Sequence, residues 1–135
     1  MTTTEPGAEG PTEEVELQAL GEQLLRTAKS SPARAAVQAL IGEHTILSAP
    51  AVRQALILHT DDGEMAHFEG LAGHQYSLGL DKQQRCFLEL VLSMVGIGMI
   101  TLAVVQNLDD RRLALLLRAT LRLAGNETLA VGTRL

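Results

Sequence analysis

The stretch FLELVLSMVGIGMITLAVV, residues 87–105, is the longest apolar run in the sequence. Three polar residues interrupt it, and two glycines lie near its middle. Projected at about 100° per residue, the segment 82–95 has one narrow polar stripe and is apolar elsewhere. A helix that is apolar over most of its circumference lies at the centre of a domain. We therefore predict that residues 82–95 form the core helix.

The composition favours a helical domain. The chain has 135 residues, enough for a single domain with a real core. Apolar residues make up 46% of it, yet it contains only two Phe, one Tyr and no Trp. A core made of Leu, Val, Ile, Ala and Met suits packed helices better than strands. The sequence predicts an all-α fold, a compact bundle of six or seven short helices.

The negative charge is concentrated at the beginning of the chain. The net charge is −5, and the first sixteen residues contain five glutamates and no basic residue. The remainder is balanced, with eleven acidic and eleven basic side chains. The first residues are also rich in Thr, Pro and Gly, which bury little apolar surface. We expect a disordered acidic tail at 1–12 and a single helical domain at 13–135.

Several helix ends carry sequence signals. Asp81 with Gln84 three residues later has the spacing of a capping box, and Asp109 or Asp110 is a typical N-cap for the last helix. A serine before Pro32 predicts another helix start. Gly42 is expected to end that helix.

Residues 52–68 fit two structures. The three-residue recurrence of Met65, Phe68 and Leu71 favours a helix. The alternative is an α/β fold with a β-hairpin at 52–68, turning at 61–63, and a strand at 99–105. In that case the order of elements resembles a roadblock-type dimerisation domain, which implies an α/β interaction module.

The segment GIGMITLAVVQN, residues 96–107, resembles the turn and second helix of LacI-type repressors. This resemblance implies a helix-turn-helix that reads DNA through Thr101, Gln106 and Asn107. Residues 35–56 similarly look like the opening helices of winged-helix regulators. The would-be recognition helix at 101–108 has no Arg or Lys to meet phosphates, so nucleic acid is not the expected partner. A small helix-turn-helix transcriptional regulator is kept as the alternative function.

The sequence offers little catalytic or metal chemistry. Histidines and carboxylates cluster at 59–74, and Glu64 and His67 have the spacing of a di-iron ligand pair, but no second such motif is present. Cys86 has no histidine near it in sequence, and the glycines at 96 and 98 lack the Lys of a phosphate-binding loop. We expect no enzyme activity, no cofactor, no metal and no small-molecule substrate.

A membrane span is also not expected. The uninterrupted part of the run, residues 90–105, is shorter than the ~20 residues that a bilayer requires. The beginning of the chain has no secretory signal, and a single cysteine suits a reducing compartment. Both features favour a cytoplasmic location.

The remaining surface signal is a stripe of arginines on the last helix. Arg111, Arg118 and Arg122 project within about 40° of one another on a helical wheel. The stripe is suited to an acidic partner or to the acidic beginning of this chain. We therefore predict a non-enzymatic protein–protein interaction module, an adaptor, whose partner is another protein or a second copy in a homodimer.

Overall fold

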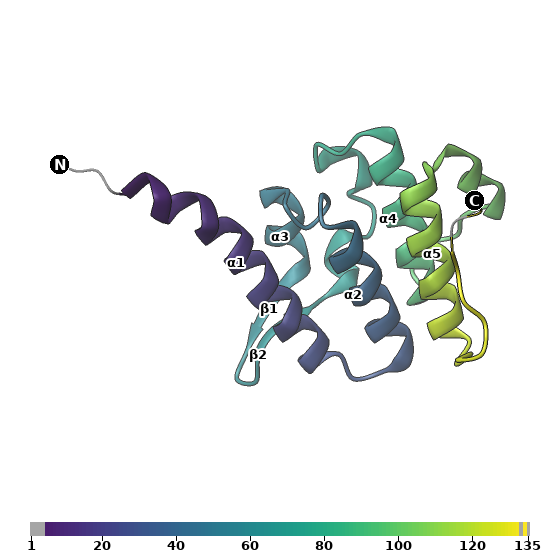
Figure 1. Cartoon of the computed structure of the whole chain (residues 1–135), viewed down its shortest axis with the longest axis horizontal. Helices are drawn as coiled ribbons and strands as arrows, with labels where there is room; N and C mark the ends of the chain where they lie inside the picture. Colours follow the sequence, from purple (N-terminus) through teal and green to yellow (C-terminus); the bar gives the residue numbers. More distant parts are fainter. Residues whose placement is uncertain (1–4, 133, 135) are drawn as a thin grey trace.

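The computed structural model describes the backbone of residues 5–132 and 134, and the side chains from residue 13 onwards within these ranges. The described part of the chain is mostly helical, as predicted, and contains one small antiparallel sheet (Figure 1). The α-helices are α1 (Glu5–Thr27), α2 (Ser31–Glu43), α3 (Pro50–Leu56), α4 (Lys82–Met94) and α5 (Asp110–Leu123). The strands are β1 (Ile57–Thr60) and β2 (Gly63–Ala66), and the 3-10 helices are η1 (Phe68–Leu71), η2 (Gln75–Ser77) and η3 (Leu102–Asn107).

The helices pack in a chain of neighbours. α1 lies against α2 and β2, α2 lies against α4 and α5, and α4 also contacts α5 and η3. Figure 1 shows α1 and the hairpin on one side of the molecule, α2 in the middle, and α4 and α5 on the other side. The first half of α1 extends beyond the rest of the fold, so its neighbours cover only its second half.

The predicted core helix is present as α4. Phe87, Leu88 and Val91 have no exposed surface. The predicted capping box also forms: the Gln84 N–H donates to the Asp81 carboxylate at 2.8 Å, and the Asp81 N–H donates to the Gln84 side chain at 2.9 Å. The local signals of this segment agree with its burial, and α4 ends within one residue of the predicted boundary.

Residues 57–66 form a hairpin, so the predicted helix is wrong there and the alternative hairpin is correct. β1 and β2 are antiparallel, with Ile57 opposite Ala66 and Thr60 opposite Gly63. Gly63 has φ +118, a conformation that favours glycine. The Thr60 hydroxyl donates to the Gly63 carbonyl at 2.7 Å and stabilises the turn. The predicted helix is correct only for α3, which lies before the hairpin.

α1 covers the outer edge of β2. The Gln23 side chain accepts the Glu64 N–H at 2.9 Å, and the buried Thr27 hydroxyl donates to the Glu64 carbonyl at 2.9 Å. Exposed strand edges leave unpaired backbone groups, and these two side chains satisfy them. The partners lie about forty residues apart in sequence, which is why periodicity alone could not favour the hairpin.

α2 continues past the predicted stop at Gly42. It includes Glu43 and ends at His44, which has φ 59 and donates its N–H to the Leu40 carbonyl. Gly42 lies directly against α5: a Cβ at this position would lie 2.7 Å from Leu115 Cδ2, so the end of that leucine side chain would have to shift. The glycine allows α5 to approach α2 closely.

Two further boundaries differ from the prediction. Residues 102–107 form the 3-10 helix η3, and the alternative strand at 99–105 is absent from this described segment. α1 begins at Glu5, whereas the sequence predicts a disordered tail up to residue 12 and the start of the helical domain at residue 13. The polar composition before residue 13 has no apolar face that could have indicated a helix. Residues 1–4 of the predicted disordered tail lie outside the described residues.

Gly70 provides a test of the packing between α3 and η1. A Cβ at Gly70 would lie 2.0 Å from the Ala55 carbonyl oxygen, whereas a Cβ at Gly132 would meet nothing within 4 Å. We expect Gly70→Ala to lower the free energy of unfolding by about 1–3 kcal/mol, the usual cost of overpacking. Gly132→Ala is the matched control and should change it by less than about 0.5 kcal/mol. Urea denaturation measures both, and equal stabilities of the two variants would contradict this packing.

Candidate functional site

The most highly connected polar group in the described structure is the carboxylate of Glu43. It lies at the end of α2, and its side chain has no exposed surface. One oxygen accepts the Ile46 N–H at 2.8 Å. The other accepts Arg112 Nε at 3.0 Å and Nη2 at 2.9 Å, and also the Thr45 hydroxyl. A buried charge is costly unless it is paired and hydrogen-bonded, and here both oxygens are satisfied.

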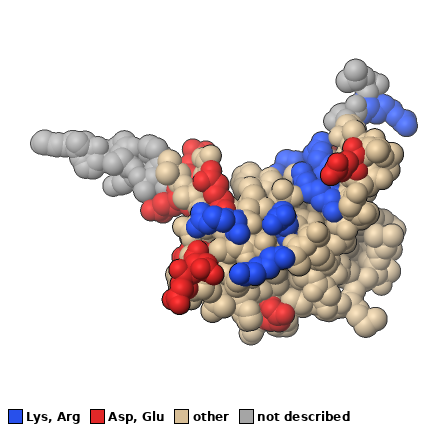
Figure 2. All heavy atoms as spheres, turned by 90° about the horizontal axis from the view of Figure 1, so that it is seen from below, with Lys and Arg blue, Asp and Glu red and all other residues tan. Residues whose placement is uncertain are grey.

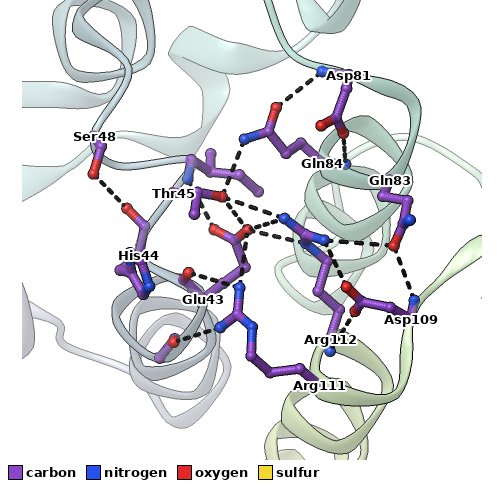
Figure 3. Close-up of polar contacts among 12 residues, drawn as sticks. Glu43, His44, Thr45, Ser48, Asp81, Gln83, Gln84, Asp109, Arg111 and Arg112 are labelled. Carbon is purple, nitrogen blue, oxygen red and sulfur yellow. Dashed lines mark hydrogen bonds and ion pairs between the residues drawn. The ribbon is translucent and has the colours of Figure 1, made fainter.

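Arg112 connects this carboxylate to α4 and α5. Its side chain is only 11% exposed, and Nη1 donates to Asp109 at 3.0 Å and to Gln83 at 3.4 Å. Gln83 in turn accepts the Asp109 N–H at 2.9 Å. Three helix ends therefore meet at one polar cluster, as Figure 3 shows. We call it the Glu43 cluster; its members are Glu43, Thr45, Gln83, Gln84, Asp109, Arg111 and Arg112.

The Glu43 cluster has the properties of a structural contact between helix ends. The Gln84 amide, whose helix is capped by Asp81, also donates to the Thr45 hydroxyl at 3.0 Å. A carboxylate with no exposed surface is inaccessible to a substrate, and its acceptors are already occupied. Its role is to hold the end of α2 against the beginnings of α4 and α5.

A groove lies between the beginning of α1 and the end of α2. Its volume is about 520 Å³, and its walls are mainly apolar. Val15, on the part of α1 that extends beyond the fold, is 60% exposed. We call this hollow the α1 groove; it is lined by Glu14, Val15, Leu17, Gln18, Ile41, His44 and Leu47.

A second hollow, of about 240 Å³, separates α2 from the end of α5. Arg34 of α2 and Arg122 of α5 both line it. Neither arginine has a carboxylate within ion-pair distance among the described residues. We call it the arginine cleft; its lining is Ser31, Arg34, Ala35, Gln38, Arg122, Gly125, Asn126 and Glu127.

The structure separates the three arginines of the predicted stripe. Arg111 donates to the Gly42 and Glu43 carbonyls, both at 3.3 Å, so it belongs to the Glu43 cluster. Arg118 donates to the Val131 carbonyl at 3.2 Å and holds the segment after α5. Arg122 alone faces an open hollow, the arginine cleft. The three arginines share one helical face, but their side chains lie in three different environments.

The residues predicted for DNA reading lie in or beside η3. Thr101 immediately precedes this six-residue 3-10 helix, and Gln106 and Asn107 are its last two residues. η3 packs against α4, and it contains no Arg or Lys. These residues are not on an α-helix that could enter a major groove in the usual way.

The histidines at 59–74 are distributed over the hairpin and the loops. The His59 and Glu64 side chains pair across the hairpin, and His67 Nδ1 lies 3.6 Å from Glu69 Oε1. Among residues 5–132 and 134, no three His, Cys, Asp or Glu side chains come together as metal ligands do. Cys86 is buried in α4. In the same described ranges, every helix falls short of the length and apolarity that a bilayer crossing demands.

The comparisons with known proteins find no matching family model, no matching curated protein and no matching solved structure.

The Glu43 cluster predicts a large difference between two neighbouring arginines. Arg112→Met would leave the buried Glu43 carboxylate without its main partner, which typically costs about 3–5 kcal/mol of unfolding free energy. Arg111→Met removes a 46% exposed side chain and should cost about 1 kcal/mol or less. Urea denaturation compares the two variants.

A second substitution tests whether the unpaired charge of Glu43 causes this loss of stability. Glu43→Gln in the Arg112→Met background removes the buried charge and keeps an acceptor for the Ile46 N–H, so it should recover part of the lost stability. The assigned pairing would be contradicted if the double variant lost as much stability as Arg112→Met alone and Glu43→Gln alone lose together.

Proposed function

We propose that this protein is a non-enzymatic interaction module, an adaptor, which binds a helical segment of another protein in the α1 groove. The observation that carries the proposal is an apolar groove beside a half-covered helix. Val15 is 60% exposed there, and Leu17, Ile41 and Leu47 line the same hollow. A volume of about 520 Å³ is within the range of about 300–1,000 Å³ that is usual for binding clefts.

The charge beside the groove favours a basic partner. Glu13, Glu14 and Glu16 are exposed on the same part of α1, and the described residues provide none of them with an ion pair. An amphipathic helix places apolar side chains on one face and charges along its flanks. The partner that fits is an amphipathic helix with apolar residues toward the groove and Lys or Arg at its edges.

The helix-turn-helix alternative remains a prediction from the sequence. DNA affinity depends largely on cations that meet phosphates, and η3 contributes none. The arginines that do face an open hollow lie between α2 and α5, away from the residues expected to read bases. We therefore propose protein binding as the function.

A designed peptide tests the proposal without a known partner. The probe is a synthetic helix with leucines along one face and lysines elsewhere, added to the isotope-labelled protein. We expect saturable NMR shifts concentrated at Val15, Leu17, Ile41 and Leu47. A peptide of the same composition in scrambled order, which has no apolar face, is the control for non-specific charge attraction.

Two matched variants locate the binding. Val15→Asp replaces an exposed apolar group in the groove by a charge and should weaken peptide binding at least about tenfold. Leu102→Asp makes the same type of change at a 73% exposed residue of η3 and should leave binding unchanged. Equal effects of the two variants, or shifts centred outside the groove, would contradict the proposal.

A further inference from the structure

The molecule carries two oppositely charged surfaces on different helices. Figure 2 shows acidic side chains near the start of the described chain and basic side chains across the middle and upper right of the same view. The basic surface includes Arg34 and Arg122, which line the arginine cleft. The acidic surface is formed by the exposed glutamates at the beginning of α1, Glu13, Glu14 and Glu16.

The arginine cleft has excess positive charge. The Arg34 side chain makes one long contact, 3.4 Å from Nη2 to the Ala28 carbonyl, and the Arg122 guanidinium makes no hydrogen bond to a described residue. Glu127 also lines the cleft, but its carboxylate lies beyond ion-pair distance of both arginines. Two guanidinium groups with one distant carboxylate leave the cleft suited to further carboxylates, which arginine binds through paired N–H donors.

The beginning of α1 offers carboxylates in a matching arrangement. Glu13 and Glu16 are three residues apart, so they project from one side of the helix. Arg53 lines a small hollow with them, but lies beyond ion-pair distance and donates to the Leu47 carbonyl at 2.7 Å. Neither glutamate lines the α1 groove, but both belong to the acidic flank beside it, so a contact through this pair competes with a basic partner for the same carboxylates.

The two surfaces cannot meet within one molecule. α2 starts only a few residues after α1 ends, so the arginine cleft lies beyond the end of α1, whereas Glu13 and Glu16 lie in the first half of that helix. At 1.5 Å per residue, Glu13 is separated from Thr27 by about 20 Å of helix. A continuous helix does not fold back on itself, so these carboxylates can reach only the cleft of another molecule.

We infer that this protein self-associates: Glu13 and Glu16 of one copy dock in the arginine cleft of a second copy, against Arg34 and Arg122. The contact joins two different surfaces, so it gives a closed dimer where a two-fold axis lets each copy contribute both of them and an open chain of copies otherwise. Its groups are exposed in the single chain, so its strength depends on ionic strength.

Sedimentation velocity of the full chain tests the inference. At about 20 mM salt we expect a concentration-dependent mass above the 14.5 kDa of one chain, and at about 500 mM salt a return to that mass, because the Debye length shortens severalfold. The single reversal Arg122→Glu should weaken association at low salt. Lys82→Glu, an equal charge change at an exposed residue of α4, is the matched control and should not.

Reversing the charges of each surface in turn tests whether the arginine cleft and the pair of Glu13 and Glu16 are the surfaces that meet. Arg34→Glu with Arg122→Glu gives a chain that is acidic on both surfaces, and Glu13→Lys with Glu16→Lys gives one that is basic on both. Each double variant alone should be monomeric at low salt, with a circular dichroism spectrum like that of the natural chain. An equimolar mixture should associate again, because each acidic surface then faces a basic one. The inference is overturned if the natural chain is monomeric at low salt. It is also overturned if either double variant still associates by itself, or if the equimolar mixture of the two stays monomeric.

Discussion

The buried ion pair between Glu43 and Arg112 is the constraint on which the rest of the structure depends. A carboxylate with no exposed surface is tolerated only where donors surround it, and those donors come from the loop after α2 and from α5, with α4 linked through Thr45 and Gln83. An error in the position of one helix end would leave the charge unsatisfied. The pair therefore penalises arrangements of the helix ends that leave the carboxylate without donors, whereas the apolar core tolerates small shifts among similar side chains.

The surfaces proposed for binding follow from this arrangement. α2 packs against α5, and Arg34 and Arg122 line the arginine cleft between these two helices. At the other end of α2, the segment after Glu43 turns toward α1 and forms one wall of the α1 groove with Leu47. The Glu43 cluster is thus the rigid support, and the exposed beginning of α1 and the end of α5 carry the free charges.

The sequence predicted the features that depend on neighbouring residues. The Asp81 and Asp109 caps and the central position of α4 are confirmed, because caps and helical faces are local properties. The hairpin was predicted only as the alternative to a helix, because its β2 edge is satisfied by Gln23 and Thr27 of α1, which lie far away in sequence. The Glu43 pairing was missed because a lone acid at a helix end is ordinary in sequence, and Arg112 comes 69 residues later. The arginine stripe was visible in the sequence, but only the fold places Arg111 in the Glu43 cluster, Arg118 against the segment after α5 and Arg122 at the arginine cleft.

Amide hydrogen exchange of Ile46 reports whether the Glu43 cluster holds the three helix ends together. Ile46 lies just after α2, where exchange is normally fast because helix ends fray. Its N–H donates to the buried Glu43 carboxylate at 2.8 Å, and Ile46 itself has no exposed surface. If the Glu43 cluster holds the helices together, this amide should exchange as slowly as those of Leu88 and Val91 in α4, through global unfolding. Exchange at the rate of an exposed loop amide, while α4 remains protected, would contradict the account.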